Sequence, residues 1–168
     1  DNFEQALINI GYDNVLDDYV LTSNINTVTY LYVGYQNISD LTGIEDFSAL
    51  TELMCHQNQL TILDVNTNTA LTDLWCWSNQ LTSLNVSANT YLTELYCNDN
   101  QLTSLDVRNG NNTNIITFSP SNNPNLHCIS VDDEIWSTNN WVNSIDPWAS
   151  FSNNCQNEIP GCTDSTVS

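Results

Sequence analysis

Three acidic residues recur every 21 positions in the middle of the chain: Glu52, Asp73 and Glu94. Paired carboxylates are the catalytic groups of glycosidases, and the retaining enzymes hold them about 5–5.5 Å apart. If the three repeats stack as neighbouring strands, the carboxylates lie about 4.8 Å apart. Every charged column on a parallel sheet has that spacing, however, and a flat sheet offers no enclosing pocket. The column therefore favours binding over catalysis.

Other catalytic patterns are not recognisable in the sequence. There is no Ser-His-Asp, Cys-His or metal-ligand pattern, and the only two histidines are His56 and His127. His56 is expected to be a surface residue, and His127 falls in a turn of the C-terminal cap without a recognisable partner. Histidine is the most frequent acid–base group near neutral pH. We therefore predict that the chain is not an enzyme and has no catalytic residues.

Large and polar side chains follow each carboxylate at fixed offsets, which predicts three outward-facing columns on one sheet. The columns are Tyr30, Glu52, Asp73 and Glu94; Tyr32, Met54, Trp75 and Tyr96; and Gly34, His56, Trp77 and Asn98. A large aromatic side chain buries about 200 Å², worth up to about 5 kcal/mol, and exposed apolar patches often mark interaction sites. We predict that the columns, apart from Gly34, bind a ligand. The alternative is that rings of adjacent coils only stack on one another.

The same 21-residue period predicts the elements that position these columns. From Leu50, Leu71 and Leu92 the chain reads LTELMCHQNQLTILDV, LTDLWCWSNQLTSLNV and LTELYCNDNQLTSLDV. A period of 20–29 residues with the pattern L-x-x-L-x-C-x-x-N-x-L is that of the leucine-rich repeat. Residues alternate inward and outward around Leu53, as in a strand with one buried face, and Asn58 then closes a turn. The sequence therefore predicts an α/β solenoid with few helices and short parallel strands on its concave face.

The period loosens on both sides, and a solenoid needs covers over its open ends. We expect an N-terminal cap at 1–27, about five coils at 28–131 with the period clearest at 50–112, a C-terminal cap at 132–157, and a linker or further module at 158–168. In the last coil, Ile116 and Phe118 are expected to replace Leu95 and Cys97. A Pro-containing insertion from 120 to 124 is expected to follow.

Both caps have patterns of their own. An amphipathic helix is predicted near the start from the spacing of Phe3, Ala6, Leu7 and Ile10, with Asn2 and Gln5 placed as a capping box and an end near Gly11. The large aromatic residues of the C-terminal cap are Trp136, Trp141, Trp148 and Phe151. We expect them to form a lid over the last coil.

The six cysteines fall into three groups. Cys55, Cys76 and Cys97 share one inward position, so they are expected to form a ladder of buried, reduced thiols that behave as small hydrophobes. Cys128 and Cys155 flank the aromatic cap, and a disulfide between them would close a loop of 27 residues. Such a bridge indicates an oxidising, extracytoplasmic location. Cys162 has no partner in this pattern.

Charge excludes several classes of partner. One basic residue faces 20 acidic ones, for a formal net charge of −19, so neither nucleic acid nor an anionic membrane is expected to bind. No stretch has the about 20 apolar residues of a membrane span. Two acidic clusters carry the oxygen ligands that calcium takes: Asp13, Asp17 and Asp18, and Asp132, Asp133 and Glu134. Neither has the spacing of a known loop motif, so no cofactor is expected, with structural calcium as the alternative.

The chain resembles secreted or cell-surface leucine-rich repeat proteins of flavobacteria. The resemblance covers essentially the whole chain and is carried by the regular coils and by the segments FEQALINIGYDNVLDDYV, DLTGIEDFSALTEL and NNPNLHCISVDD, with a later Trp and Cys155. It implies an exported protein that mediates adhesion or binding. Near the end, GCTDST resembles a linker motif of multidomain proteins in that group, and Asp164-Ser165-Thr166 resembles their O-glycosylation acceptor.

These patterns together predict an extracellular, non-catalytic binding or adhesion module that is secreted or attached to the bacterial cell surface. Sugars stack on indole and phenol rings and bond to carboxylates and amides, whereas a protein partner uses Trp and Tyr as hot spots. The expected ligand is therefore a glycan or a protein. The alternative is a structural or self-assembling surface element, in which copies of the chain associate.

Overall fold

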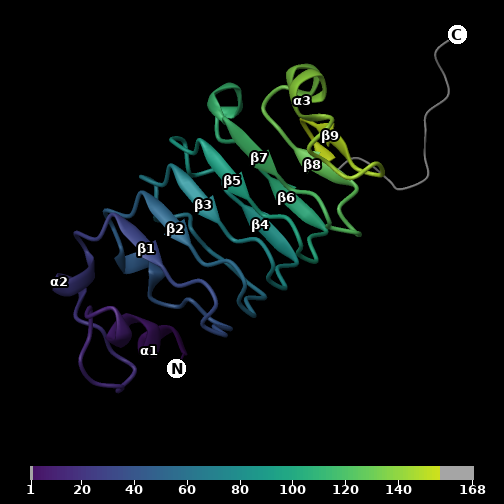
Figure 1. Cartoon of the computed structure of the whole chain (residues 1–168). Coiled ribbons are helices and arrows are strands. Elements are labelled where there is room, and N and C mark those ends of the chain that lie inside the picture. Colours follow the sequence, from purple (N-terminus) through teal and green to yellow (C-terminus); the bar gives the residue numbers. More distant parts are fainter. Residues whose placement is uncertain (1, 156–168) are drawn as a thin grey trace, which may run out of the picture.

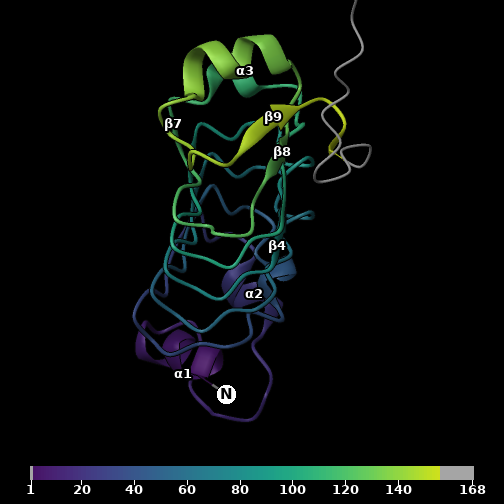
Figure 2. The ribbon, with the colours of Figure 1, turned by 90° about the vertical axis from the view of Figure 1, so that its right-hand side faces the viewer.

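The structure is a computed structural model and describes residues 2–155. The predicted linker at 158–168, with Cys162 and the glycosylation acceptor, lies outside these residues. Coils of chain are stacked along one axis, with α1 at one end and α3 at the other (Figure 1). Seen from the side, each coil has two long walls joined by turns (Figure 2). This is the predicted solenoid.

One wall is a five-stranded parallel sheet, which we call the concave sheet. Its strands, in spatial order, are β1 (Tyr30–Tyr32), β2 (Glu52–Met54), β3 (Asp73–Trp75), β5 (Glu94–Tyr96) and β7 (Thr117–Ser119). The middle residue of each strand points inward and is buried, and the two flanking residues face outward. Adjacent strands pair without a register shift, so Leu53 lies beside Leu74 and Leu74 beside Leu95.

The opposite wall is a second parallel sheet, which the sequence analysis does not predict. Its strands, in spatial order, are β4 (Ser83–Asn85), β6 (Ser104–Asp106), β8 (Cys128–Ser130) and β9 (Ser150–Ser152). Figure 2 shows β7 on one wall and β4, β8 and β9 on the other. Leu84 and Leu105 point inward from this wall, each buried at the centre of its strand.

A single apolar core runs between the two walls, and a column of asparagines at the turn supports it. Asn79 is 8 % exposed. Its Oδ1 accepts from the N–H of Leu60 at 3.0 Å, and its Nδ2 donates to the carbonyls of Cys55 at 3.1 Å and Cys76 at 3.0 Å. One side chain thus ties adjacent coils together, as the turn position of the repeat predicts.

The predicted cysteine ladder is confirmed. Cys55, Cys76 and Cys97 are free thiols with no exposed surface. Burial raises the pKa of Cys55 and of Cys97 to about 12 and holds the pKa of Cys76 well above its ordinary value. All three are therefore neutral thiols at physiological pH, which makes them poor nucleophiles.

The N-terminal cap contains α1 (Asn2–Asn9) and α2 (Thr22–Ile25). Phe3, Ala6 and Leu7 are buried as predicted, but Ile10 is 47 % exposed because the helix ends at Asn9 and the chain then turns. The predicted capping box is also wrong. Asn2 donates to the carbonyl of Asn37, and Gln5 donates to the side chain of Asn9, so within residues 2–155 neither amide bonds to the backbone of its own helix.

The C-terminal cap contains α3 (Glu134–Trp141) and β9. Trp141 is 6 % exposed and its ring lies 4.4 Å from that of Phe118, so it covers the last coil as predicted. Trp148 is 48 % exposed, and its Nε1 donates to the carbonyl of Asn123 at 3.4 Å, so it contacts the turn of the last coil at the edge of the lid. The predicted disulfide between Cys128 and Cys155 is present. The bridge fastens the cap to β8.

The predicted register of the last coil is wrong. Phe118 pairs with Leu95, and Ile116 lies on the surface, 82 % exposed. Leu95 and Phe118 are 23 residues apart, against 21 for Leu74 and Leu95. The extra length lies upstream, where the turn contains the 3-10 helix η2 (Asn112–Asn114). A similar short helix, η1 (Ile44–Asp46), lies in the coil before β2.

The segment 120–124 is accordingly the turn of this coil and not an insertion. Asn123 takes the place that Asn79 has in its own coil. Its Nδ2 donates to the carbonyls of Cys97 and Pro120, and its Oδ1 accepts from the N–H of Leu102 at 3.0 Å.

Candidate binding face on the concave sheet

Strand pairing places the predicted ligand-binding residues on one face. In the first column Tyr30, Glu52, Asp73 and Glu94 are direct neighbours, and in the second Tyr32, Met54, Trp75 and Tyr96. The third column follows one step further along the chain, where backbone bonds join the coils at His56, Trp77 and Asn98. We call these eleven side chains the recognition face. Its members come from four successive coils, so the stacking of the solenoid alone assembles it.

The acidic column has carboxylates on three successive coils. Glu52, Asp73 and Glu94 are half-buried and belong to strands about 4.8 Å apart. The recognition face has no basic residue, because the only one in the sequence is Arg108, which bonds to Asp106 near the opposite wall. The face therefore has a negative charge that no lysine or arginine of the chain neutralises.

Six ring-bearing side chains form one contiguous cluster beside the carboxylates. We call it the aromatic cluster; it consists of Tyr32, Tyr35, His56, Trp75, Trp77 and Tyr96. The rings of Trp75 and Tyr96 meet edge to face at 5.0 Å. Both tryptophans are half-buried, whereas Tyr32 is 43 % exposed. The cluster therefore covers itself only in part and presents ring surface to solvent.

His56 is not the surface residue that the sequence predicts. It is 4 % exposed. Its ring stacks on Trp77 at 4.6 Å and 9°, and the edges of Tyr32 and Tyr35 meet it at 5.5 and 5.3 Å. The space exists because the neighbouring coil has Gly34, where a Cβ would lie 2.9 Å from His56 Nε2. His56 is thus the centre of the aromatic cluster.

The environment of His56 is one of packed rings. Burial lowers the pKa of His56, so the imidazole is neutral at physiological pH. Its Nδ1 has no hydrogen-bond partner within residues 2–155. The arrangement fits packing and recognition.

Sequence reasoning missed Tyr35. Its φ of +61° is shared by Gln57, Ser78 and Asp99 at the same turn position of later coils. That conformation carries the Tyr35 ring back to His56 and leaves it 56 % exposed. The residue follows Gly34 directly and departs from the polar residues of the other coils, which is the signal that would have found it.

Two residues of the C-terminal acidic cluster considered for calcium accept hydrogen bonds from the backbone. Asp133 caps α3 by accepting from the N–H of Trp136, and Asp132 accepts from the N–H groups of Gly110 and Asn112. At the other end, Glu4, Asp13 and Asp17 offer one oxygen each within 4.8 Å of one another. Three oxygens are about half of the shell of six to eight that calcium takes.

Two solved structures that resemble the chain are internalins of Listeria monocytogenes. One, encoded by inlF, superposes with a TM-score of 0.57 and 24 % identity over 77 % of this chain and 42 % of its own. The chain has the leucine-rich repeat fold. The other is the functional domain of InlJ, described as including a cysteine ladder, with a TM-score of 0.48 and 30 % identity over 67 % of this chain and 32 % of its own.

This chain thus spans less than half the length of either internalin structure. No family model matches the sequence, and no curated protein matches it either. Within residues 2–155, every helix is too short or too polar to cross a membrane.

Proposed function

We propose that this protein is a non-catalytic binding module, exposed outside the cytoplasm, which captures a partner protein on its recognition face. The observation that carries this proposal is the aromatic cluster, which leaves ring surface in water on an otherwise acidic sheet. Solenoids use their extended concave surfaces for binding. Aromatic residues surrounded by polar groups have the composition of an interaction hot spot.

The disulfide bond of the C-terminal cap supports a location outside the cytoplasm. The disulfide between Cys128 and Cys155 persists in oxidising compartments, such as the periplasm or the extracellular space. The three ladder thiols do not conflict with this inference, because a fully buried thiol is inaccessible to oxidants and to other thiols.

The charge of the face favours a partner with basic side chains. Lysine or arginine from the partner would meet the carboxylates of Glu52, Asp73 and Glu94 and would also contact the faces of Trp77 and Tyr96. Cation–π contacts add about 0.5–1 kcal/mol each at exposed sites. Complementary charge raises the association rate more than the affinity. The carboxylates would therefore mainly speed association, and the central rings would supply most of the affinity.

A glycan is the second candidate, and the geometry of the rings favours it. Trp75 and Trp77 are two positions apart on one coil. The amide of Asn98 follows Trp77 in the third column, and the carboxylate of Asp73 lies in the first column, beside that of Trp75. Indole faces stack on the C–H faces of a sugar ring while amides and carboxylates bond to its hydroxyls. Neutral sugars fit this face, because acidic ones would meet the carboxylate column.

The proposal is tested by screening the protein on a glycan array and on an array of purified extracellular proteins, with calcium and with chelator. Dissociation constants for any ligand found are then compared between the wild type and Trp77→Ala. Removing a hot-spot ring costs 2 kcal/mol or more, so we expect affinity to fall by at least about 30-fold. Tyr91→Ala is the matched control, because Tyr91 is a 67 % exposed ring outside the recognition face.

Circular dichroism must show that both variants remain folded. Equal weakening by Trp77→Ala and Tyr91→Ala, or unchanged binding by both, would contradict recognition through the aromatic cluster. A ligand found only on the glycan array would replace the protein partner with a sugar and retain the site. Absence of any ligand from both arrays would count against a binding module.

A further inference from the structure

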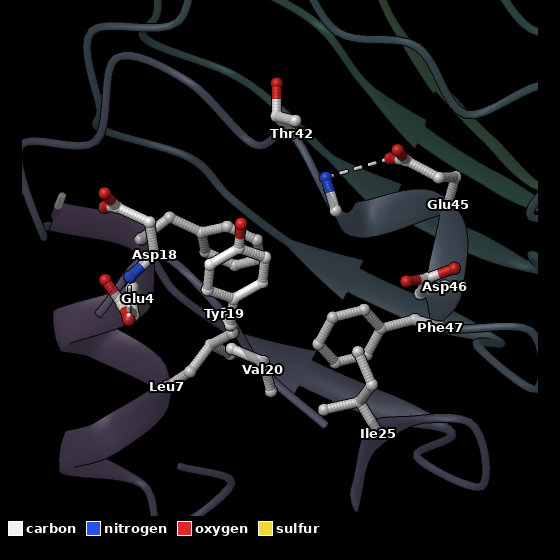
Figure 3. A pocket seen from close by; sticks show the side chains of 12 residues that line it. Glu4, Leu7, Asp18, Tyr19, Val20, Ile25, Thr42, Glu45, Asp46 and Phe47 are labelled. Atoms are coloured by element: carbon white, nitrogen blue, oxygen red, sulfur yellow. Dashed lines mark hydrogen bonds between the residues drawn. The ribbon is translucent and has the colours of Figure 1, made fainter. Parts of the chain in front are cut away.

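A cavity of about 230 Å³ lies at the N-terminal end of the solenoid, away from the recognition face (Figure 3). It is lined by α1, by the segment 18–25 and by the coil that carries η1, and it opens to solvent. Its floor is made of apolar side chains that are at most 4 % exposed: Phe3, Leu7, Ile25 and Phe47. None of its lining residues belongs to the recognition face.

The rim of the cavity is acidic. Glu45 and Asp46 line it from η1, and Tyr19 lies on the side of α1 (Figure 3). Glu45 Oε2 accepts from the N–H of Gly43 at 2.9 Å, and Asp46 Oδ2 accepts from the hydroxyl of Thr22 at 3.4 Å. Each carboxylate oxygen has two lone pairs, so both groups retain capacity to accept a hydrogen bond from a ligand.

The wall beside α1 is held in place by Glu4, which is 4 % exposed. Its Oε1 accepts from the N–H groups of Asp17 and Asp18 at 2.7 and 2.8 Å. These bonds hold Asp18 in a left-handed conformation, φ +67°, a conformation that residues other than glycine seldom adopt. The following residues, Tyr19 and Val20, are thereby turned over the cavity. The walls are formed before any ligand arrives.

The size and lining of the cavity define the ligand. Pockets for drug-sized molecules measure about 300–1,000 Å³, so this one fits a group the size of a single long side chain. Its apolar floor suits an aliphatic chain, and its carboxylate rim suits a cation. Among the described residues that line it, four are acidic and none is basic. We propose that the cavity binds a primary alkylammonium group, the chemistry of a lysine side chain.

In this arrangement the methylene chain lies against Leu7 and the ring of Phe47, while the ammonium group meets the carboxylates of Glu45 and Asp46. Lysine commonly buries its stem and keeps its charged end at a polar rim. The ring of Tyr19, which is 80 % exposed, is placed to cover the bound chain. The site is independent of the recognition face, so one could fail while the other stands.

The test uses capped lysine, N-acetyl-lysine methylamide, titrated into isotope-labelled protein and followed by NMR. Capped norleucine is the matched probe, since it has a similar chain without the ammonium. We expect shifts confined to amides lining the cavity, an affinity at least fivefold higher for capped lysine, and weaker binding as salt screens the carboxylates. Pentylamine distinguishes the sources: equal affinity indicates a free amine as the ligand, and weaker affinity indicates a lysine within a polypeptide.

Glu45→Gln provides the decisive variant, because glutamine keeps an acceptor for the N–H of Gly43 while it removes the charge. Glu134→Gln is its control: the same substitution, on an exposed residue of α3 at the far end of the chain. Capped lysine should bind at least fivefold more weakly to Glu45→Gln and unchanged to Glu134→Gln. Equal affinity for capped lysine and capped norleucine, equal effects of the two substitutions, or shifts spread over the acidic surface would each overturn the proposal.

Discussion

The two walls of the solenoid are made by the same repeat, yet their outward residues differ in kind. On the concave sheet, the outward positions of β2, β3 and β5 hold Glu52, Asp73, Trp75 and Tyr96 among others. On the opposite wall, β4 and β6 present Ser83 beside Ser104 and Asn85 beside Asp106. The inward residues of these five strands are buried leucines on both walls.

The comparison of the two walls shows which side chains the stacking of coils requires: the inward leucines are needed, and outward rings are not. The opposite wall stacks in full parallel register with small polar side chains, so coils do not require rings on their outer surface in order to pair. Large aromatics on only one wall are therefore not explained by stacking. Exposed ring surface is costly in water, and this cost is the basis of the binding role proposed for the face.

The largest expected effect is at an inward residue. Asn79→Ala removes the partners of the Leu60 N–H and of two carbonyls, all buried. Each buried group left unsatisfied costs about 1–3 kcal/mol, so we expect the free energy of unfolding to fall by about 3–5 kcal/mol. Urea titration measures it. The exposed outward control, Ser83→Ala, should change stability by less than about 0.5 kcal/mol. Similar losses in both variants would show that the division between inward and outward positions is wrong.

Gly34→Ala, next to the aromatic cluster, is expected to cause a loss of stability of intermediate size. Replacing glycine by alanine normally stabilises a protein by about 0.4–1 kcal/mol where the backbone permits it. Here the new Cβ would lie 2.9 Å from His56 Nε2, and that ring is held by Trp77 and two tyrosines. We expect a loss of about 1–3 kcal/mol in urea titrations, as for overpacking.

The control for this prediction repeats Gly34→Ala in a His56→Ala background. With the imidazole gone, the methyl group has room, and the change should become neutral or stabilising. A loss of the same size in both backgrounds would mean that the backbone at Gly34 and not the contact with His56 sets the cost.

The regular coils could be predicted from the sequence because each position repeats. Leu53, Leu74 and Leu95 have one environment, and so do Cys55, Cys76 and Cys97; the columns of the recognition face follow from the same spacing. The disulfide could be predicted because its two cysteines lie outside the repeat and flank the cap.

The burial of His56, the register of the last coil and the second sheet could not be predicted, because they depend on residues that differ between coils or whose types do not indicate a strand. His56 is buried because one neighbouring coil has Gly34 and another has Trp77, so its burial is a property of three coils and not of its own polarity. The sequence predicts the wrong register for the last coil because Ile116 and Phe118 have the same two-residue spacing as Leu95 and Cys97. This spacing conceals the longer turn upstream. The second sheet was missed because Ser83 and Asn85 are polar residues that also occur in turns.

The smallest expected effect is a pH dependence of the free energy of unfolding that arises from His56 on the concave sheet. Burial lowers the pKa of His56 below its unfolded value of about 6.5. Below pH 6.5 the unfolded chain therefore binds more protons at this site than the native protein does, and stability must fall as the pH is lowered. The neutral imidazole contributes its full stability above pH 6.5. The loss begins there and is complete once the pH is below the native pKa.

Urea titrations at pH 7.5 and pH 5.5 measure this loss in the wild type and in His56→Phe, which keeps a ring but does not titrate. Carboxylates change protonation alike in both proteins, so the difference between their pH dependences isolates His56. The exposed His127 is the control, and His127→Gln should behave as the wild type. If His56→Phe lost as much stability as the wild type between the two pH values, the His56 imidazole would not be buried by the surrounding rings. The aromatic cluster would then be an open surface in which His56 meets solvent, and the packing contrast between the two walls would be smaller than the structure shows.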